Sequence, residues 1–217
     1  MSTPKTSKSQ SSPRPKAAFS PVAVAYSPVS KGAQKGNLTG LPRILQDLIK
    51  KFQASLGMWI SHHKEGMDVI SKMKSLNLFE GSKRNYKLDD ELQVLCDLLA
   101  ENVQELVLVV EMMTKLRNEL EAITQLSEVK QNNYDSPENP LFLTWPISKF
   151  VETVDYILKS YQEELKVKQM VLKEIGLSQD SNELAFSENA WRYQPMLFPD
   201  EINFKIEAAL LETGIVQ

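Results

Sequence analysis

The chain has 217 residues, of which 42% are hydrophobic, and a formal net charge of −3 at pH 7. This length allows one domain with a tail or two small domains, and the composition is that of a globular protein. Its eight glycines form no phosphate-binding loop, and no apolar run approaches the roughly 18 residues that a membrane span needs. The single cysteine, Cys96, excludes an internal disulfide and favours a reducing, intracellular compartment.

Residues 1–40 differ from the rest of the chain, because they contain six Lys or Arg residues and no Asp or Glu. About half of them are Ser, Thr, Pro or Gly, so we expect a disordered tail that cannot bury enough surface to fold. Four of its residues precede a proline and are candidate sites for a proline-directed kinase: Thr3, Ser12, Ser20 and Ser27. Chance Ser-Pro pairs in a Ser/Pro-rich tail are the alternative. A mitochondrial transit peptide is disfavoured by the prolines and the single arginine.

Apolar residues at spacings of three and four from Leu41 to Met73 predict a first helix over residues 41–76. Near its start, Arg43, Ile44 and Leu45 match the short Arg-x-Leu pattern that docks on cyclins, although the helix stripe also needs Leu45. Two adjacent histidines, His62 and His63, follow within the same helix. They point about 100° apart, so they cannot hold a metal as an i, i+4 pair would.

A second helix is predicted over residues 89–129, where the three-four rhythm is almost unbroken and acidic residues open the first turn. The five residues from Leu106 to Val110 are all apolar, so the apolar surface wraps around the helix there. We expect this part of the helix to be covered on more than one side. Leu106, Val107 and Val110 are therefore candidate partner-binding residues. A buried β-strand is the competing interpretation, which the helical pattern on both sides disfavours.

The segment from Pro140 to Pro146 places bulky apolar side chains between two prolines, as a rigid lead-in to a helix predicted over residues 146–175. Leu141, Phe142 and Trp145 must be buried there, by the chain's own helices or by a partner, and are further candidate contacts.

Glycines followed by a hydrophobic residue then mark two helix ends by the Schellman pattern. Gly176 with Leu177 closes the third helix, and Gly214 with Ile215 closes a short helix predicted over residues 200–213. We expect residues 180–198 to be less regular, with a short helix and a turn.

Together these elements predict an all-α fold, a long antiparallel, coiled-coil-like three-helix bundle with short C-terminal helices. The domain division is a disordered basic tail over 1–40 and a helical bundle over 41–217. Such a bundle could also bury every stripe internally as a monomer, without a partner.

The sequence contains no recognisable set of catalytic, cofactor-binding or metal-binding residues, so we expect no enzyme, cofactor or metal. Cys96 lies among leucines of the second helix, where an inert buried thiol is expected. The acidic bundle disfavours direct binding of nucleic acid.

Several motifs in the C-terminal third resemble the cyclin-dependent kinase 2-interacting protein family. They are Pro140-Leu141-Phe142 with Thr144-Trp145-Pro146, Phe150, the Tyr161, Glu164, Leu165 and Lys168 register, Trp191 with Gln194-Pro195, and Leu210-Leu211-Glu212-Thr213-Gly214. The resemblance covers roughly residues 85–215, and the first forty residues show no alignable motif.

The resemblance implies a nuclear and cytoplasmic adaptor. This adaptor would pair with another small helical protein and, together with AAA+ ATPase subunits, form one assembly. That assembly would serve maturation of the large ribosomal subunit and DNA replication and genome stability. The alternative is a regulatory ligand of cyclin-dependent and replication-origin kinases in replication and checkpoint signalling, held through the tail sites and the Arg43–Leu45 element.

Overall fold

The computed structural model of the chain describes residues 39–76, 86–129 and 140–215, all within one compact unit. These residues form five helices and, within the described ranges, no strand, which confirms the all-α prediction. The predicted disordered tail falls, up to residue 38, outside the described residues. The helices are α1 (Leu41–Ser75), α2 (Tyr86–Val129), α3 (Ile147–Ile175), α4 (Ser181–Tyr193) and α5 (Pro199–Glu212).

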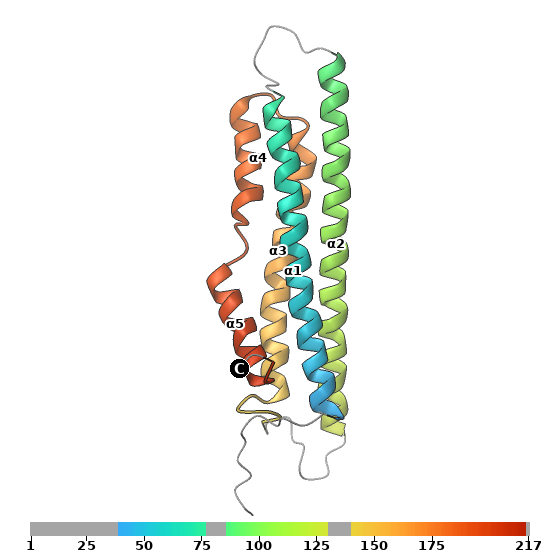
Figure 1. Ribbon diagram of the computed structural model, residues 1–217, viewed down its shortest axis with the longest axis vertical. Coiled ribbons are helices and arrows are strands. Elements are labelled where there is room, and N and C mark those ends of the chain that lie inside the picture. Colours follow the sequence, from blue (N-terminus) through green and yellow to red (C-terminus); the bar gives the residue numbers. More distant parts are fainter. Residues whose placement is uncertain (1–38, 77–85, 130–139, 216–217) are drawn as a thin grey trace, which may run out of the picture. The chain divides into compact units, whose positions relative to one another are not determined.

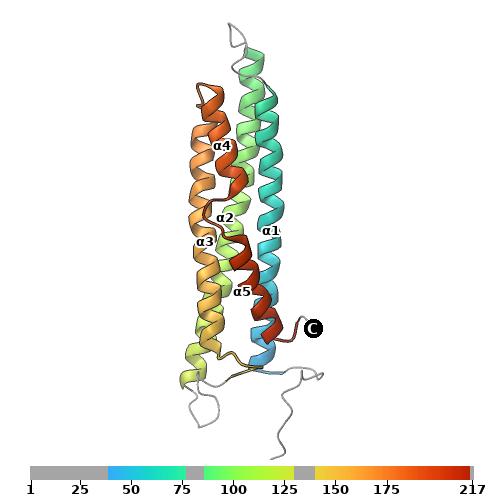
Figure 2. The ribbon, with the colours of Figure 1, turned by 90° about the vertical axis from the view of Figure 1, so that its left-hand side faces the viewer.

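The two short helices together take the place of a fourth long one. α2 packs between α1 and α3, while α4 and α5 each pack against both α1 and α3 (Figure 1). α4 and α5 follow one another along the same side of the bundle (Figure 2). The directions alternate, so the arrangement is an up-down-up-down four-helix bundle whose last helix is interrupted. The three long helices and short C-terminal helices of the sequence analysis are present, and the short ones complete a four-sided core.

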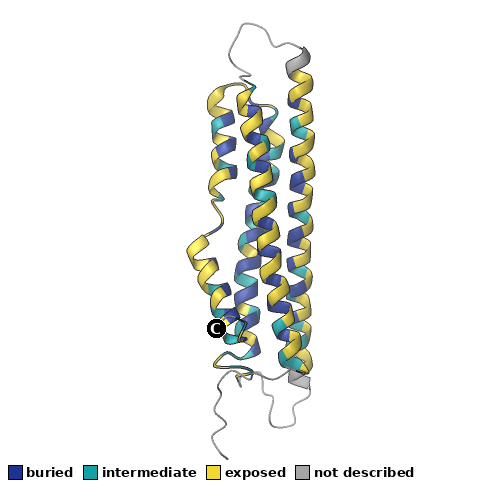
Figure 3. Cartoon of the chain, in the orientation of Figure 1, coloured by how far each residue is buried: buried dark blue, intermediate teal, exposed yellow. Residues whose placement is uncertain are grey.

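The core runs along the inner faces of all five helices (Figure 3). α1, α2 and α3 contain 35, 44 and 29 residues, lengths of about 52, 66 and 44 Å. The largest fully buried hydrophobic side chains are Trp59, Trp191, Phe52 and Phe150. The predicted stripes therefore face inward. Among the described residues, no helix has the length and apolar character that crossing a membrane requires.

α4 is a regular helix in a segment for which the sequence predicted only a short helix and a turn. Its start is fixed by Asp180, whose side chain accepts hydrogen bonds from the backbone nitrogens of Asn182 at 2.7 Å and Glu183 at 3.0 Å. The Glu183 carboxylate accepts in return from the backbone nitrogen of Gln179 at 2.8 Å. This is a reciprocal arrangement close to a capping box, and the Asp-x-x-Glu spacing is its sequence signal.

The two predicted Schellman ends have different outcomes. Gly214 has φ +71°, and the backbone nitrogen of Ile215 donates to the oxygen of Leu210 at 3.0 Å, which confirms the prediction there. The prediction at Gly176 is wrong, because its φ is −72° and Leu177 is 76% exposed. A Cβ on Gly176 would lie 3.0 Å from Cys96 Sγ, so this glycine gives room to a neighbouring helix.

Candidate functional site

Glu212, the last residue of α5, holds the turn that leads into α3. Its carboxylate accepts hydrogen bonds from the backbone nitrogens of Thr144 at 2.8 Å and Trp145 at 3.1 Å, and from the Thr144 hydroxyl. The turn is also closed on itself, because the backbone nitrogen of Leu141 donates to the oxygen of Trp145 at 3.2 Å. We call Thr144, Trp145 and Glu212 the Glu212 clamp. It joins two of the sequence motifs that lie 68 residues apart.

Burial alone would raise the pKa of Glu212, but the hydrogen bonds from Thr144 and the backbone of the turn stabilise the carboxylate and lower its pKa. The Glu212 clamp therefore depends on the ionised carboxylate of Glu212. The neighbouring residue adds a second link, since the oxygen of Thr213 accepts from Gln46 Nε2 of α1 at 3.0 Å. The end of α5 is thus attached both to α1 and to the start of α3.

The predicted partner residues of this turn pack mainly on the bundle itself. Trp145 and Phe142 make edge-to-face contacts with the buried ring of Phe150, with centroids 5.1 and 6.2 Å apart. Leu141 also packs against the core. All three are half-buried, while Leu143 is exposed. Structural packing therefore accounts for most of their apolar surface.

The partner residues predicted on α2 need a correction. Leu106 and Val110 are buried in the core, and Val107 is half-buried, so the folded bundle does not present Leu106 or Val110 to a partner. The exposed apolar residues at this level are Leu108 and Met112. Apart from Leu108, the Val-rich run is buried or half-buried against the bundle's own helices, because α2 packs between α1 and α3.

The Arg43–Leu45 element also needs a correction as a cyclin-docking site. Leu45 is fully buried in the core, whereas Arg43 and Ile44 are exposed. A docking leucine must be free to enter a groove on its partner, so this element cannot dock while α1 is folded. The predicted phosphorylation sites Thr3, Ser12, Ser20 and Ser27 lie outside the described residues.

A buried ion pair lies where α4 ends. Glu164 and Lys168 of α3 have fully buried side chains, and Lys168 Nζ lies 2.9 Å from Glu164 Oε1. Lys168 also donates to the backbone oxygen of Trp191 at 2.6 Å, and Glu164 accepts from the backbone nitrogen of Met196 at 3.0 Å. We call these residues, together with Gln194, the joint cluster. It satisfies backbone groups that the interruption between α4 and α5 leaves without helical partners.

Burial raises the pKa of Glu164 and lowers the pKa of Lys168, while their mutual attraction opposes both shifts. The interruption itself is at Gln194, which has φ +45° and whose side chain accepts from Trp59 Nε1 at 2.8 Å. Trp59 in turn contacts the Tyr161 ring edge to face at 5.0 Å. The joint cluster thus connects α3, the end of α4 and α1, and its two buried charges pair with each other.

Trp191 occupies the centre of this region, between α3 and α1. Its ring lies 4.6 Å from Lys168 Nζ and stacks on His63, and its Nε1 donates to the backbone oxygen of His63 at 3.0 Å. α1 has a glycine, Gly66, where a Cβ would lie 2.1 Å from the indole ring. Burial, with Lys168 and Lys64 nearby, lowers the pKa of His63 to about 4, so this ring is neutral at pH 7.

The other chemically reactive candidates do not converge on a site. Burial and the nearby Asp97 raise the pKa of the half-buried thiol of Cys96, which favours the unreactive thiol form. Within the described residues, the one polar contact of the His62 ring is between its Nδ1 and Oε2 of Glu65, 3.1 Å apart. Those residues contain no cluster of three His, Cys, Asp or Glu side chains that could hold a metal ion.

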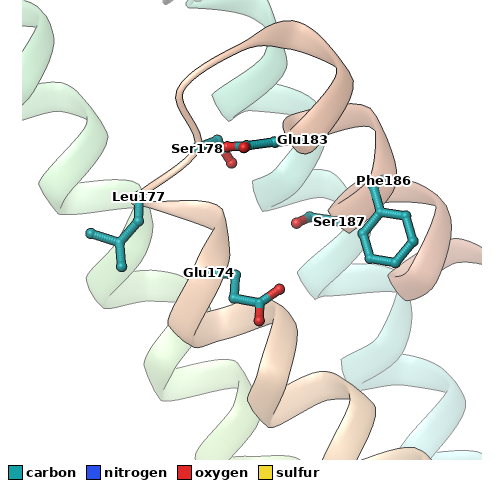
Figure 4. A pocket seen from close by; sticks show the side chains of 6 residues that line it. All are labelled: Glu174, Leu177, Ser178, Glu183, Phe186 and Ser187. Carbon is teal, nitrogen blue, oxygen red and sulfur yellow. The ribbon is translucent and has the colours of Figure 1, made fainter.

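A shallow pocket of about 330 Å³ lies at the turn between α3 and α4 (Figure 4). None of its lining residues was a candidate from the sequence, and one of its carboxylates, Glu183, already caps α4. The pocket is lined by Glu174, Leu177, Ser178, Glu183, Phe186 and Ser187.

Comparison with known proteins finds relatives of a single name. Cyclin-dependent kinase 2-interacting protein of human is 31% identical over 126 residues, which is 58% of this chain and 58% of the human protein. The Xenopus laevis protein of that name is 23% identical over 194 residues, 83% of this chain and 93% of the relative. The bovine one is 29% identical over 133 residues, 61% of each chain. The matches thus span less than two thirds of the human and bovine proteins. No family model matches the chain.

The resemblance read from the sequence motifs is confirmed, because the chain is similar to three proteins that carry the name of this family. The structure adds what those motifs do. The Thr144-Trp145 and Glu212 motifs form the Glu212 clamp, and the Glu164, Lys168, Trp191 and Gln194 motifs form the joint cluster. Both fasten the interrupted fourth helix to the bundle.

Proposed function

We propose that the chain is a non-enzymatic interaction protein whose partner is a cyclin-dependent kinase. The observation that carries the proposal is the name shared by the human, Xenopus and bovine relatives, each a cyclin-dependent kinase 2-interacting protein. The fold supports a binding role, since the motifs of the resemblance hold a rigid bundle together rather than assemble reactive groups. The coarse function is therefore recognition of another protein.

The kinase contact is assigned to the basic tail and its four Ser/Thr-Pro sites, Thr3, Ser12, Ser20 and Ser27. The buried position of Leu45 removes the Arg43–Leu45 element from this role. Phosphorylation at each site would add roughly −1.5 to −2 charge to a tail that has no acidic residue. Such a change would alter both the kinase contact and any contact of the tail with acidic surfaces.

The test compares the full chain with a variant that begins at residue 39, which keeps α1 intact, and with a variant in which all four tail sites are alanine. Binding to a purified cyclin-dependent kinase 2–cyclin complex is measured by biolayer interferometry, and folding by circular dichroism. We expect the full chain to bind and both variants to bind at least tenfold more weakly with unchanged helicity. Full binding by the truncated chain would contradict the tail assignment, and no binding by the full chain would contradict the proposal.

A second candidate is an adaptor that pairs with a small helical protein and docks on an AAA+ ATPase in ribosome maturation and replication, as the resemblance implies. The observation that favours it is a set of large aromatic side chains on α4, on α5 and at the residue before α5 that the bundle leaves between 61% and 73% exposed. Surfaces of this kind mark protein contacts. We call them the α4–α5 face: Phe186, Tyr193, Phe198 and Phe204.

Two changes separate the candidates. The double variant Phe198→Asp with Phe204→Asp should lose co-purification with ATPase subunits and keep kinase binding. Removal of residues 1–38 should weaken kinase binding and leave the co-purification with ATPase subunits unchanged. If neither change affects ATPase recovery, the α4–α5 face is not its docking surface. The resemblance also favours a nuclear and cytoplasmic distribution, which immunofluorescence of the full chain would check. ATP hydrolysis by the purified chain would refute the non-enzymatic role.

A further inference from the structure

The side of α2 that faces away from the bundle carries a second row of apolar residues, in addition to the row that faces the core. Among the described helices, α2 contacts α1 and α3 alone, and this side is turned away from both (Figures 1 and 3). The five large apolar side chains of the row are between 41% and 61% exposed. We call it the outer row, and its apolar members are Val94, Leu98, Leu108, Met112, Ala122 and Leu126.

The outer row follows a seven-residue repeat. Its positions are 94, 98, 101, 105, 108, 112, 115, 119, 122 and 126, which are separated by four and three residues alternately. This spacing of 3.5 residues per turn is that of a coiled-coil seam rather than of a scattered exposed surface. The row spans about 48 Å of helix, so it is long enough for another helix to pack along it.

The order of residues in the row is the same from either end. Counted from position 94 toward Val110, the row has two apolar, two charged and one apolar residue. Counted from position 126 toward Val110, it has the same order. If a second α2 packs antiparallel about a two-fold axis level with Val110, Val94 faces Leu126 and Leu98 faces Ala122. Leu108 then faces Met112 on both sides of the axis. A two-fold interface needs this kind of self-complementarity.

The charged positions follow the same two-fold relation. Glu105 faces Lys115 of the second copy, twice per dimer, and Glu101 faces Glu119 of the second copy, also twice. None of these four side chains has a hydrogen-bond or ion-pair partner within the described residues. The Glu105–Lys115 contacts favour the pairing, and the Glu101–Glu119 contacts oppose it. The balance favours a weak, reversible dimer.

α1 adds one apolar residue beside the axis. Asn102 Nδ2 of α2 lies 3.5 Å from Glu65 Oε2 of α1, which sets the register of this antiparallel pair. Met58 lies two turns before Glu65 in α1, and in this antiparallel register it is level with Val109 of α2. Met58 is 40% exposed. Exposed apolar side chains, Leu108 and Met112, therefore lie on both sides of the axis, and Met58 is level with it.

We propose that the outer row of α2 is a homodimerisation surface, at which two copies of this chain pair antiparallel about a two-fold axis level with Val110. The interface is small, since roughly 20–30 residues a side are usual and the outer row contributes ten positions. The dimer is accordingly expected at micromolar concentrations and above.

Sedimentation velocity of the full chain tests this, from about 1 μM to about 1 mM. We expect the mass to rise from 24.6 kDa toward twice that value with concentration. Leu108→Glu should weaken the dimer roughly 100-fold, because each dimer carries the change twice. Phe204→Glu is the matched control on the α4–α5 face and should leave the dimer unchanged, and circular dichroism verifies that both variants are folded.

Charge exchange tests the antiparallel register itself. Lys115→Glu should weaken the dimer about tenfold, and combining it with Glu105→Lys should restore the wild-type affinity. Glu101→Lys should tighten the dimer about tenfold, since it replaces two repulsive contacts with two attractive ones. A chain that stays monomeric at about 1 mM, a dimer that Phe204→Glu disrupts but Leu108→Glu does not, or a double exchange that fails to restore affinity would each overturn the proposal.

Discussion

Two glycines of the same helix should respond oppositely to the same substitution. Gly57 lies on the exposed side of α1 with no atom within 4 Å of an added Cβ, so Gly57→Ala should stabilise the protein by about 1 kcal/mol through helix propensity. At Gly66 the added Cβ would lie 2.1 Å from Trp191 Cζ2, 2.8 Å from Cε2 and 2.9 Å from Asn102 Oδ1. Carbon atoms in contact are about 3.5–4.0 Å apart, so the indole ring would have to move by about 1.5 Å.

The indole ring cannot move freely, because Trp191 is fully buried and held by hydrogen bonds at both its Nε1 and its backbone oxygen. Overpacking of this kind costs about 3 kcal/mol, against which helix propensity returns about 1 kcal/mol. We therefore expect Gly66→Ala to lower the free energy of unfolding by about 2 kcal/mol. The two variants should differ by about 3 kcal/mol.

Urea unfolding followed by circular dichroism at 222 nm measures both variants under the same conditions. A double-mutant cycle identifies the neighbour, because Trp191→Phe removes the part of the ring that Cβ meets. In that background Gly66→Ala should cost at least about 1 kcal/mol less than in the wild type. If Gly66→Ala stabilised the protein as Gly57→Ala does, or if the cycle showed no coupling, the indole ring of Trp191 would not be what excludes a side chain at position 66.

Three further changes test the contacts around the fourth helix. Lys168→Met leaves a buried carboxylate unpaired and should cost about 3–5 kcal/mol, while Glu164→Gln combined with Lys168→Met should recover part of that loss in urea unfolding. Glu212→Gln should lower the free energy of unfolding by about 1 kcal/mol, and the exposed Glu207→Gln is its control. Folding lowers the pKa of Glu212, so the stabilisation by its carboxylate is present above pH 4.5 and is lost as the pH falls through the folded pKa. His63 has a folded pKa of about 4 against 6.5 unfolded, so only the unfolded chain takes up a proton between these values. Stability should therefore fall as the pH drops from 6.5 toward 4, and His63→Gln should flatten that part of the profile.

The long helices can be predicted from the sequence because their apolar residues recur at regular spacings. Stripes at spacings of three and four depend on local order alone, and they place α1, α2 and α3 within three residues of their observed bounds. The same logic fails in the run from Leu106 to Val110, where every residue is apolar and periodicity cannot identify the buried face. There the neighbouring helices decide, and they bury Leu106 and Val110 and leave Leu108 exposed.

The two glycine ends show a second limit. Gly176-Leu177 and Gly214-Ile215 have the same local pattern, but only Gly214 adopts the left-handed conformation. What distinguishes Gly176 is Cys96 on another helix, whose sulfur would lie 3.0 Å from an added Cβ. A contact between residues 80 positions apart leaves no local mark in the sequence.

The candidate site shows the same limit more strongly. The sequence identified the members of the Glu212 clamp and the joint cluster as motifs, yet it gave no sign that Thr144 meets Glu212 or that Lys168 meets Trp191. Those pairs form only when α4 and α5 lie end to end against α1 and α3. The motif residues are therefore recognisable from sequence, while their structural role needs the fold.

The proposed kinase binding is tested most directly by a titration of the purified full chain with a purified cyclin-dependent kinase 2–cyclin complex, followed by isothermal titration calorimetry. We expect saturable binding of one kinase complex per chain. Removal of residues 1–38 should weaken that binding while the helical circular dichroism signal of the bundle persists. A folded full chain that releases or absorbs no heat of binding at either of two temperatures would contradict the proposed kinase binding.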